Sequence, residues 1–451
     1  MTVSYADSFN NCAIYLPALK FEYAKFAHDG TFKRPLPFSA QDLNFLNPAT
    51  KLFHYPWALL SAGQAVKSIK QNDPPTMVSV RDRKRSIVVG DSGGYQVQSG
   101  NIKYRGPDTV RRMMQWMEAN TDYSMALDFP TGGIKDGQIA KHTARLRSEG
   151  HGDLIDEAAS NNRQAADFNA ALVQTSLNNQ QFLLQRVPGA TKFLNVLQGR
   201  NEPESKAWYE HVKHYAFEGW AFAGGHREDF TLLLQRLIDL RDDKLLENAQ
   251  WVHILGKSEL DLACLYTVVQ RAVRRHINPT LQFSFDSASH SLTAARYRVY
   301  TGAYFDKQGW SMVPARMADA ALAGSSENFG DYLVSQGFST GTKRPSKSGP
   351  NRRFRGADTV VSYAITVGDV CVDATKNSPW DTASGDIVAN HNIEAMVRAM
   401  KQAHKIFYDP AEVLKIPVRA RIVREIVDMV FTSNQPDKLI RECRSALQQV
   451  T

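Results

Sequence analysis

Carboxylate side chains follow directly after three short apolar runs in this sequence, at Asp91, Asp128 and Asp286. Two further runs are followed by an amide, Gln198, and by the glycine pair 224–225. Aspartates can act as nucleophiles or as general acids and bases. If the runs are buried parallel strands, their carboxyl ends lie at one edge of the sheet, where these side chains can work together.

A serine motif also occurs in this set. Gly90-Asp91-Ser92-Gly93-Gly94 matches both the GDSGG of chymotrypsin-like proteases and the G-x-S-x-G nucleophile elbow. The protease needs its His and Asp before the serine, but little chain precedes Ser92 and no two-barrel β-pattern occurs there. The elbow needs a helix straight after the serine, whereas we expect 93–100 to be extended or irregular. A serine hydrolase stays as a minor alternative.

The apolar runs predict the fold. They are short, rich in β-branched or aromatic residues and bounded by turn residues, as buried parallel strands are. Several begin roughly 30 residues apart, about the length of one strand-helix unit. The sequence therefore predicts an α/β fold, a (β/α)8 TIM-like barrel with insertions and a C-terminal helical extension, and chemistry at the strand ends. The six runs are 86–91, 124–128, 193–198, 220–223, 252–255 and 282–286.

Helix signals lie between these runs. Asp108 is expected to cap one helix. Ser258 and Asp261 give a second helix a capping-box-like start, and 231–240 has a helical pattern. From Ile393 onward, helical patterns dominate the chain.

Two segments do not fit the strand-helix repeat. The stretch between the second and third runs is too long for one unit and predicts an insertion near 131–190. We expect residues 1–330 to form the barrel with this insertion, and 331–451 to form a basic loop and a C-terminal helical region. The loop, about 341–355, is rich in Gly, Pro and Ser. It is either a solvated linker or a phosphate-contacting arm.

Composition limits the class of protein. The 451 residues are 43% hydrophobic and 22% charged, which supplies a sizeable core and excludes wholesale disorder. A net charge of +8 favours an anionic partner such as nucleic acid. The four cysteines are far apart and form no CxxC pair, which fits a reducing compartment. Without a leader-like start or a membrane-length apolar stretch, the expected location is cytoplasmic, with no membrane partner.

Several of these motifs occur together in a fixed order. Asp91–Val97 reads DSGGYQV, 197–199 reads LQG, 224–225 is a glycine pair and 285–286 reads FD. This ordered set resembles the DSGG(F/Y)QV, VQG, glycine-pair and FD motifs of the tRNA-guanine transglycosylase superfamily. Asp128, within Leu127-Asp128, fits the base-reading aspartate of that family.

The resemblance implies exchange of a base at C1′ of a nucleotide. A carboxylate nucleophile divides this exchange into two easier displacements through a glycosyl-enzyme intermediate, and Asp286 is assigned that role. A second carboxylate moves protons to the departing base and from the incoming one, and Asp91 is assigned that role. Each aspartate alone also fits a structural role, Asp91 as a turn former and Asp286 as an Asx turn or cap.

A guanine-like base would be read by groups at the other strand ends. Asp128 can accept from the N1–H and 2-amino donors, while the Gln198 amide and the Gly225 N–H serve O6. Tyr95 can stack on the ring. The structural alternatives are a capping Asp, a surface Gln, a glycine turn and a core tyrosine. The other residues assigned to the base are Ser92, Gly93, Gly94 and Gly224.

The sequence departs from the tRNA enzymes near its C-terminus. Those enzymes bind zinc through a CxCxxC cluster and a later histidine in an HN pair. Here His391-Asn392 resembles the HN pair and Cys371 precedes it, but the other cysteines are missing. Structural zinc takes four ligands, so we expect no zinc of the usual type, unless Asp or distant His residues complete a site, and no cofactor. Alternatively, His391 is a cap ahead of the helix at Ile393.

Through these departures the sequence resembles a divergent branch of the superfamily. This branch is found in phages and bacterial genomic islands and acts on DNA. The implied function is a DNA-guanine transglycosylase, which exchanges a flipped guanine for a free 7-deazaguanine base such as 7-cyano-7-deazaguanine. Basic loops would contact phosphates, and proteins of a DNA-modification system would be its partners. The alternatives are a tRNA-guanine transglycosylase that has lost its zinc site and a non-catalytic nucleic-acid-binding subunit. The presence of all three aspartates argues against the second.

Overall fold

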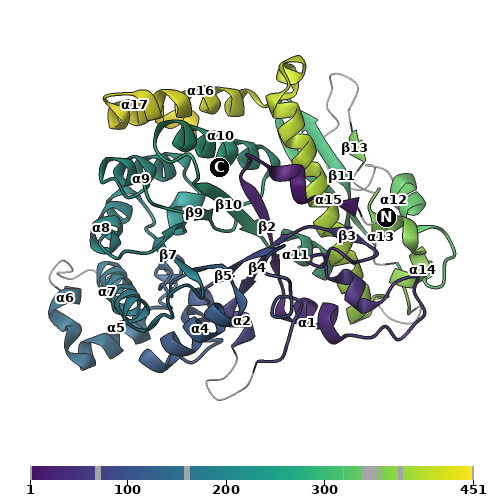
Figure 1. Ribbon diagram of the computed structural model, residues 1–451, viewed down its shortest axis with the longest axis horizontal. Coiled ribbons are helices and arrows are strands. Elements are labelled where there is room, and N and C mark those ends of the chain that lie inside the picture. Colours follow the sequence, from purple (N-terminus) through teal and green to yellow (C-terminus); the bar gives the residue numbers. More distant parts are fainter. Residues whose placement is uncertain are drawn as a thin grey trace.

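Eight parallel strands close into a barrel in the computed structural model (Figure 1), which confirms the predicted fold class. The structure describes residues 3–66, 73–156, 163–317, 319–336, 353–355, 358–373 and 379–448. Around the barrel the strand order is β10-β2-β4-β5-β6-β7-β8-β9, and β9 pairs with β10 to close it. The strands are β2 (Ile14–Leu19), β4 (Trp57–Ser61), β5 (Ile87–Asp91), β6 (Tyr123–Met125), β7 (Lys192–Leu197), β8 (Gly219–Phe222), β9 (Trp251–Ile254) and β10 (Gln282–Ser287).

All six predicted strands are present, and the sequence patterns missed β2 and β4. Pro17 lies inside β2 and Pro56 directly precedes β4, and proline weakens the local signal for a central strand. Barrel closure overrides that signal, because β2 pairs with β10 on one side and with β4 on the other. The predicted run at 124–128 is also too long, since β6 ends at Met125.

Helices follow the strands and cover the barrel (Figure 1). The predicted helix at 231–240 is confirmed, but both capping predictions are wrong. Pro107 opens its helix after Gly106 and leaves Asp108 in the first turn. The helix expected at Ser258 starts at Leu260 without a side-chain cap, because Asp261 instead pairs with Arg419 at 2.9 Å. The helices are α1 (Phe21–Asp29), α2 (Ala62–Ala65), α3 (Gly94–Gln98), α4 (Pro107–Asn120), α8 (Glu202–Val212), α9 (Phe230–Asp242), α10 (Leu260–His276) and α11 (Ser289–Ala295).

The long connection between β6 and β7 contains helices of its own. The longest, α7, packs against α4 and α8 as a barrel helix does, and α5 and α6 also pack against it. The region near 131–190 therefore combines one regular barrel helix with added helical segments. These are η3 (Thr131–Gly133), α5 (Ala140–Leu146), η4 (Arg147–His151), α6 (Gly152–Asp156) and α7 (Arg163–Gln185).

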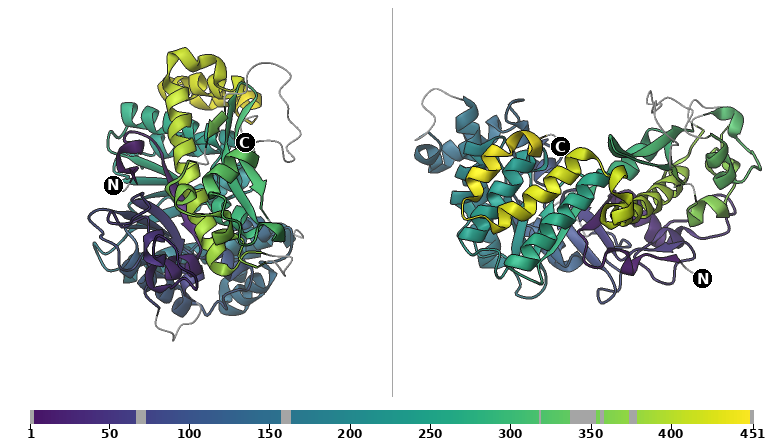
Figure 2. Two further views of the ribbon diagram at one scale, coloured as in Figure 1. Left: turned by 90° about the vertical axis from the view of Figure 1, so that its right-hand side faces the viewer. Right: turned by 90° about the horizontal axis from the view of Figure 1, so that it is seen from above.

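After the last barrel strand, the chain forms a three-stranded sheet and a group of helices. β11 and β12 form an antiparallel sheet with β13, and α15 packs against β11, α11 and α10. The α16–α17 segment lies along α10 and α9, as Figure 2 shows. The elements are β11 (Arg298–Asp306), β12 (Gly309–Arg316), α12 (Phe329–Gln336), β13 (Arg353–Arg355), α13 (Val360–Ala364), α14 (Val367–Val370), α15 (Thr382–Tyr408), η7 (Pro410–Lys415), α16 (Val418–Thr432), α17 (Pro436–Glu442) and α18 (Arg444–Gln448).

The helical C-terminal region is thus present, whereas most of the predicted basic loop, 341–352, lies outside the described residues. Among the described residues, no helix combines the length and apolar character needed to cross a membrane. Short elements complete the fold, with β1 pairing with β3. They are β1 (Val3–Ser4), β3 (Phe53–His54), η1 (Ala6–Phe9), η2 (Ala40–Leu43), η5 (Gly224–Arg227) and η6 (Ala320–Leu322).

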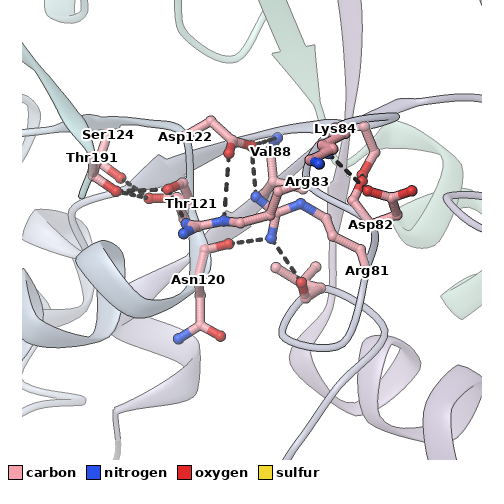
Figure 3. Close-up of polar contacts among 12 residues, drawn as sticks. Arg81, Asp82, Arg83, Lys84, Val88, Asn120, Thr121, Asp122, Ser124 and Thr191 are labelled. Atoms are coloured by element: carbon pink, nitrogen blue, oxygen red, sulfur yellow. Dashed lines mark hydrogen bonds and ion pairs between the residues drawn. The ribbon is translucent and has the colours of Figure 1, made fainter. Parts of the chain in front are cut away.

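A buried ion pair fastens the end of the barrel where β5 and β6 begin (Figure 3). Arg81, whose side chain is 1% exposed, lies 2.6 Å from Asp122. It also donates to the carbonyl groups of Val78 and Asn120. Asp122 accepts from the Val88 N–H at 2.8 Å, so this carboxylate joins the loop before β5 to both strands.

Replacing Asp122 tests this contact. Asp122→Ala is expected to lower the free energy of unfolding by about 3 kcal/mol, because the Arg81 guanidinium then stays buried without its counter-charge. Urea unfolding followed by circular dichroism measures the change. Asp108→Ala is the matched control, since Asp108 pairs with Arg111 on an exposed helix face, and such pairs contribute under about 1 kcal/mol. Equal effects of the two substitutions would contradict this role.

Candidate active site

A cavity of about 580 Å³ lies at the carboxyl ends of the barrel strands. Seven of the ten residues singled out from the sequence line it, and they come from five different strand ends. Ser92, Gly93 and Gly225 do not line the cavity. The seven lining residues are Asp91, Gly94, Tyr95, Asp128, Gln198, Gly224 and Asp286.

The Asp286 carboxylate is held through hydrogen bonds to only one of its two oxygens. Its Oδ1 accepts from the Gly256 backbone N–H at 2.7 Å and lies 3.2 Å from His253 Nε2. Its Oδ2 makes no hydrogen bond within the described part of the chain, and the side chain is 13% exposed. The carboxylate is therefore fixed in orientation while one oxygen is left for a reacting atom.

A chain of buried hydrogen bonds stands behind Asp286. Because side chains two apart on a strand share a face, Trp251 with His253 and Ser284 with Asp286 point the same way, and His253 pairs in register with Ser284. The Trp251 indole N–H, which can only donate, lies 2.6 Å from Ser284 Oγ, and that hydroxyl lies 2.8 Å from His253 Nδ1. For a neutral ring this order places the proton on Nε2, so His253 donates to Asp286.

Asp91 lies in the same cavity, at the end of β5. Burial raises the pKa of its carboxyl above the ordinary value, the adjacent Ser61 hydroxyl opposes this rise, and the charge of Asp286 adds to it. Ser61 is the registered neighbour of Asp91 across β4 and β5. A carboxyl with a raised pKa beside a second carboxyl is suited to holding and releasing a proton.

Asp128 lies beyond the end of β6, in a loop that α7 supports. Asn178 donates to the Leu127 carbonyl at 2.8 Å, and the Phe129 N–H donates to Thr175 at 3.0 Å. These two bonds, to helix residues 46 and 51 positions later in the chain, hold the loop on each side of Asp128. The buried carboxylate therefore keeps a defined position outside regular structure.

The polar end of the cavity is a carboxylate-amide pair. Asp128 Oδ2 accepts from Gln198 Nε2 at 2.7 Å, and its Oδ1 accepts from the Ser92 hydroxyl at 3.2 Å. Thr131 donates to Gln198 Oε1 at 3.3 Å, which fixes the orientation of the amide. Burial raises the pKa of Asp128 to about 6, the bond from Gln198 opposes this rise, and the charge of Asp91 adds to it.

Two glycines let the backbone lie close to Asp128 and Gln198. A Cβ on Gly94 would lie 2.4 Å from the Asp128 carbonyl oxygen. Gly224 has φ of +57°, and a Cβ there would lie 2.7 Å from Gln198 Oε1. Gly225 does not have the predicted role, because its N–H already donates to the Gly199 carbonyl at 2.7 Å.

The segment after Ser92 differs from the sequence prediction. Residues 94–98 form the short helix α3, where an extended or irregular segment was expected. Gly93, in the left-handed region with φ of +84°, turns the chain. The contacts of Gly94 with the Asp128 loop then stabilise a helix that the local sequence favours only weakly. Within the described chain, Ser92 Oγ bonds only to Asp128 and the Gly94 N–H. A serine hydrolase would need a histidine in contact with Ser92.

Tyr95 lies at the mouth of the cavity. Its side chain is 63% exposed and it lines the cavity. It is therefore not the core tyrosine of the structural alternative. From this position the ring can cover a planar ligand that enters the cavity.

Sequence reasoning missed several lining residues. Lys20 and Gln64 follow β2 and β4, the two strands that the patterns did not predict, and Arg227 belongs to η5. His253 carried a usable signal, since it is a polar residue inside the apolar run 252–255. Its link to Asp286 depends on register across two strands, which a single sequence does not display.

The histidine suggested for an atypical metal site makes hydrogen bonds with both ring nitrogens. His391 lies inside α15, so the alternative of a helix cap is wrong. Its Nδ1 lies 2.6 Å from Thr359 Oγ1 and its Nε2 lies 2.8 Å from the Tyr300 carbonyl oxygen. Within the described residues, no group of three or more His, Cys, Asp or Glu side chains is arranged to hold a metal ion.

No protein-family model matches the chain, and no curated protein matches it significantly.

The raised pKa of Asp128 predicts a pH-dependent stability. Between about pH 4 and pH 6 the folded protein binds this proton more tightly than the unfolded chain, so the free energy of unfolding falls as the pH rises. The loss from Asp128 is about 3 kcal/mol for a pKa shift of about two. Asp128→Asn removes the titrating carboxyl. The difference in unfolding free energy between wild type and variant should therefore fall by this amount as the pH rises through this range. Urea unfolding from pH 4 to 7 measures the difference, with Asp108→Asn as control, and a pH-independent difference would refute the shift.

Proposed function

We propose that this chain is a DNA-guanine transglycosylase, which exchanges guanine in DNA for a free 7-deazaguanine base. One observation carries the proposal. A single cavity at the barrel strand ends holds two candidate catalytic carboxylates, Asp91 and Asp286, beside the buried pair Asp128 and Gln198. This arrangement suits breaking a glycosidic bond next to a bound purine.

In the first displacement, Oδ2 of Asp286 attacks C1′ of the target nucleotide. The C1′–N9 bond breaks, its electron pair leaves with the guanine, and a covalent glycosyl ester forms on Asp286. Asp91 in its protonated form gives its proton to the departing base. His253 and Gly256 hold Oδ1 throughout, so the attacking oxygen needs little reorientation.

In the second displacement, the incoming 7-deazaguanine gives its N9 proton to Asp91. The N9 nitrogen attacks C1′, the ester bond to Asp286 breaks, and the carboxylate is restored. The proton that Asp91 lost in the first step returns in the second, so the cycle is balanced without a cofactor. His253, which is held by Ser284 and Trp251, keeps its contact with Oδ1 of Asp286 while that carboxylate departs as the leaving group.

Base selection would occur at the Asp128–Gln198 pair. An ionised Asp128 accepts hydrogen bonds from N1–H and the 2-amino group of a guanine-like base, while adenine offers no such pair of donors there. The second N–H of Gln198 is left for O6 once the first is given to Asp128. Tyr95 at the cavity mouth supplies a ring for stacking.

The choice of DNA over tRNA is supported by the C-terminal region. His391, which resembles the zinc-ligating histidine of the tRNA enzymes, has both ring nitrogens bonded to Thr359 and Tyr300. Both nitrogens of His391 that could bind zinc are thus occupied by hydrogen bonds. A base in duplex DNA would reach the cavity by flipping, at a cost of a few kcal/mol.

The central test is base exchange by the purified protein. Labelled 7-deazaguanine bases are offered with duplex DNA, single-stranded DNA and tRNA in parallel. We expect label in DNA, at least 10³-fold less with Asp286→Asn, and a smaller loss with Asp91→Asn. Asp108→Asn is the control, since Asp108 lies exposed on α4. Label in tRNA alone would make the protein a tRNA transglycosylase, and no label in any nucleic acid would overturn the proposal.

His253 gives a separate prediction about positioning. His253→Asn should lower kcat by roughly 10- to 100-fold, because Asp286 loses the bond that orients its free oxygen. KM for the free base should stay unchanged, because the base contacts Asp128 and Gln198. Ser284→Ala, which removes only the hydroxyl behind the ring, should shift kcat in the same direction by less. An equal rise of KM for the base in both variants would indicate a general disturbance of the cavity instead.

A further inference from the structure

We propose that Lys20 and Arg227 are phosphate contacts on either side of Asp286, which bind the phosphodiester groups flanking the target nucleotide. This inference rests on the proposed function, since it assigns a binding site to the nucleic-acid substrate. It is carried by the positions of the two cations around the barrel and by the charge of the cavity between them.

The barrel order places the two cations on opposite sides of the nucleophile. Asp286 belongs to β10, whose neighbours are β9 and β2. Lys20 directly follows β2 at the start of α1. Arg227 belongs to η5, which follows β8 on the far side of β9. Both side chains line the cavity that contains Asp286.

Arg227 lies against the loop that holds the nucleophile. A Cβ on Gly256 would lie 3.0 Å from Arg227 Nη1, and the Gly256 N–H is a hydrogen-bond donor to Asp286. Within the described residues, the ion pair of Arg227 is a loose one, 3.5 Å from its Nε to the exposed Glu228. Its two terminal nitrogens are therefore left for a bidentate contact with a phosphate.

Lys20 faces the other side of the same strand end. It is exposed and makes no ion pair within the described part of the chain. Burial lowers the pKa of His290, which follows β10, and the charge of Lys20 adds to this fall. Burial raises the pKa of Asp386 on α15 to about 7, and the charge of Lys20 opposes this rise. The ammonium group is thus near the segment after Asp286, with an open side toward the cavity.

The charge of the cavity explains why such cations are needed. Its lining includes Asp91, Asp128, Asp136 and Asp286, and carboxylates repel a polyanionic backbone. The base and sugar of a flipped nucleotide enter the cavity, while its two flanking phosphates stay near the mouth. Cations on both sides of the nucleophile offset the repulsion where the backbone must approach most closely.

The test measures how DNA binding depends on salt. Fluorescence anisotropy gives Kd for guanine-containing single-stranded DNA at several KCl concentrations, for wild type and for Lys20→Ala, Arg227→Ala and the double variant. Each single substitution should reduce the slope of log Kd against log[KCl] by about 0.7, the value for one phosphate on a single strand. KM for DNA in the exchange reaction should rise roughly tenfold, with KM for the free base unchanged. Arg227→Lys should keep the slope.

Arg275→Ala is the matched control. Arg275 is an exposed cation in the last turn of α10, at the opposite end of the barrel, and pairs with Asp428. Its replacement should leave slope and KM unchanged. The same slopes are measured on tRNA, so the contact is tested whichever nucleic acid is the substrate.

The outcomes separate this inference from the proposed function. If wild type exchanges bases but the Lys20 and Arg227 variants keep its salt slope, the inference is wrong and the function stands. The variants could instead shift the pH profile of kcat and KM for the free base while the salt slope of Kd stays unchanged. In that case the cations only balance the charge of the cavity carboxylates, and the inference is again wrong. If wild type neither binds nor modifies any nucleic acid, both proposals fail.

Discussion

The pairing of β10 with β9 and β2 is the constraint on which the rest of the site depends. It closes the barrel, and its register places His253 opposite Ser284 and so brings the ring to Asp286. A shift of one residue would turn Asp286 to the other face of the strand. The same closure brings the N-terminal strand β2 beside the last barrel strand, so residues far apart in sequence share one cavity.

The cost of burying charge shapes the interior of this cavity. Removing a carboxylate from water is unfavourable unless hydrogen bonds or a proton replace the lost hydration. Asp286 is held by two donors, whereas Asp91 and Asp128 have raised pKa values, so they bind protons more readily. The surroundings thus hold Asp286 by hydrogen bonds and favour the protonated form at Asp91 and Asp128. This difference allows one to act as nucleophile and another to carry a proton.

The segments around the site depart most from local sequence preference. Asp128 lies in a loop held by Asn178 and Thr175 of α7, and α3 forms although its residues carry only a weak helix signal. The Gly225 N–H, which was predicted to bind O6 of the base, donates to the Gly199 carbonyl instead. In each case a tertiary contact outweighs the local preference, as is common where a chain is shaped to fit a ligand.

The sequence by itself determined the barrel class and most of the residues that meet in its cavity. The residue pattern and length of the apolar runs indicate buried strands. Because parallel strands place their carboxyl ends together, the sequence alone predicts that Asp91 and Asp286 share one site. The pattern failed at β2, because the local effect of Pro17 masks a strand that pairing stabilises. Only the tertiary structure decided that His253 supports Asp286 and that Lys20 lies nearby. Such contacts depend on register and barrel closure, which are properties of the whole chain rather than of any segment.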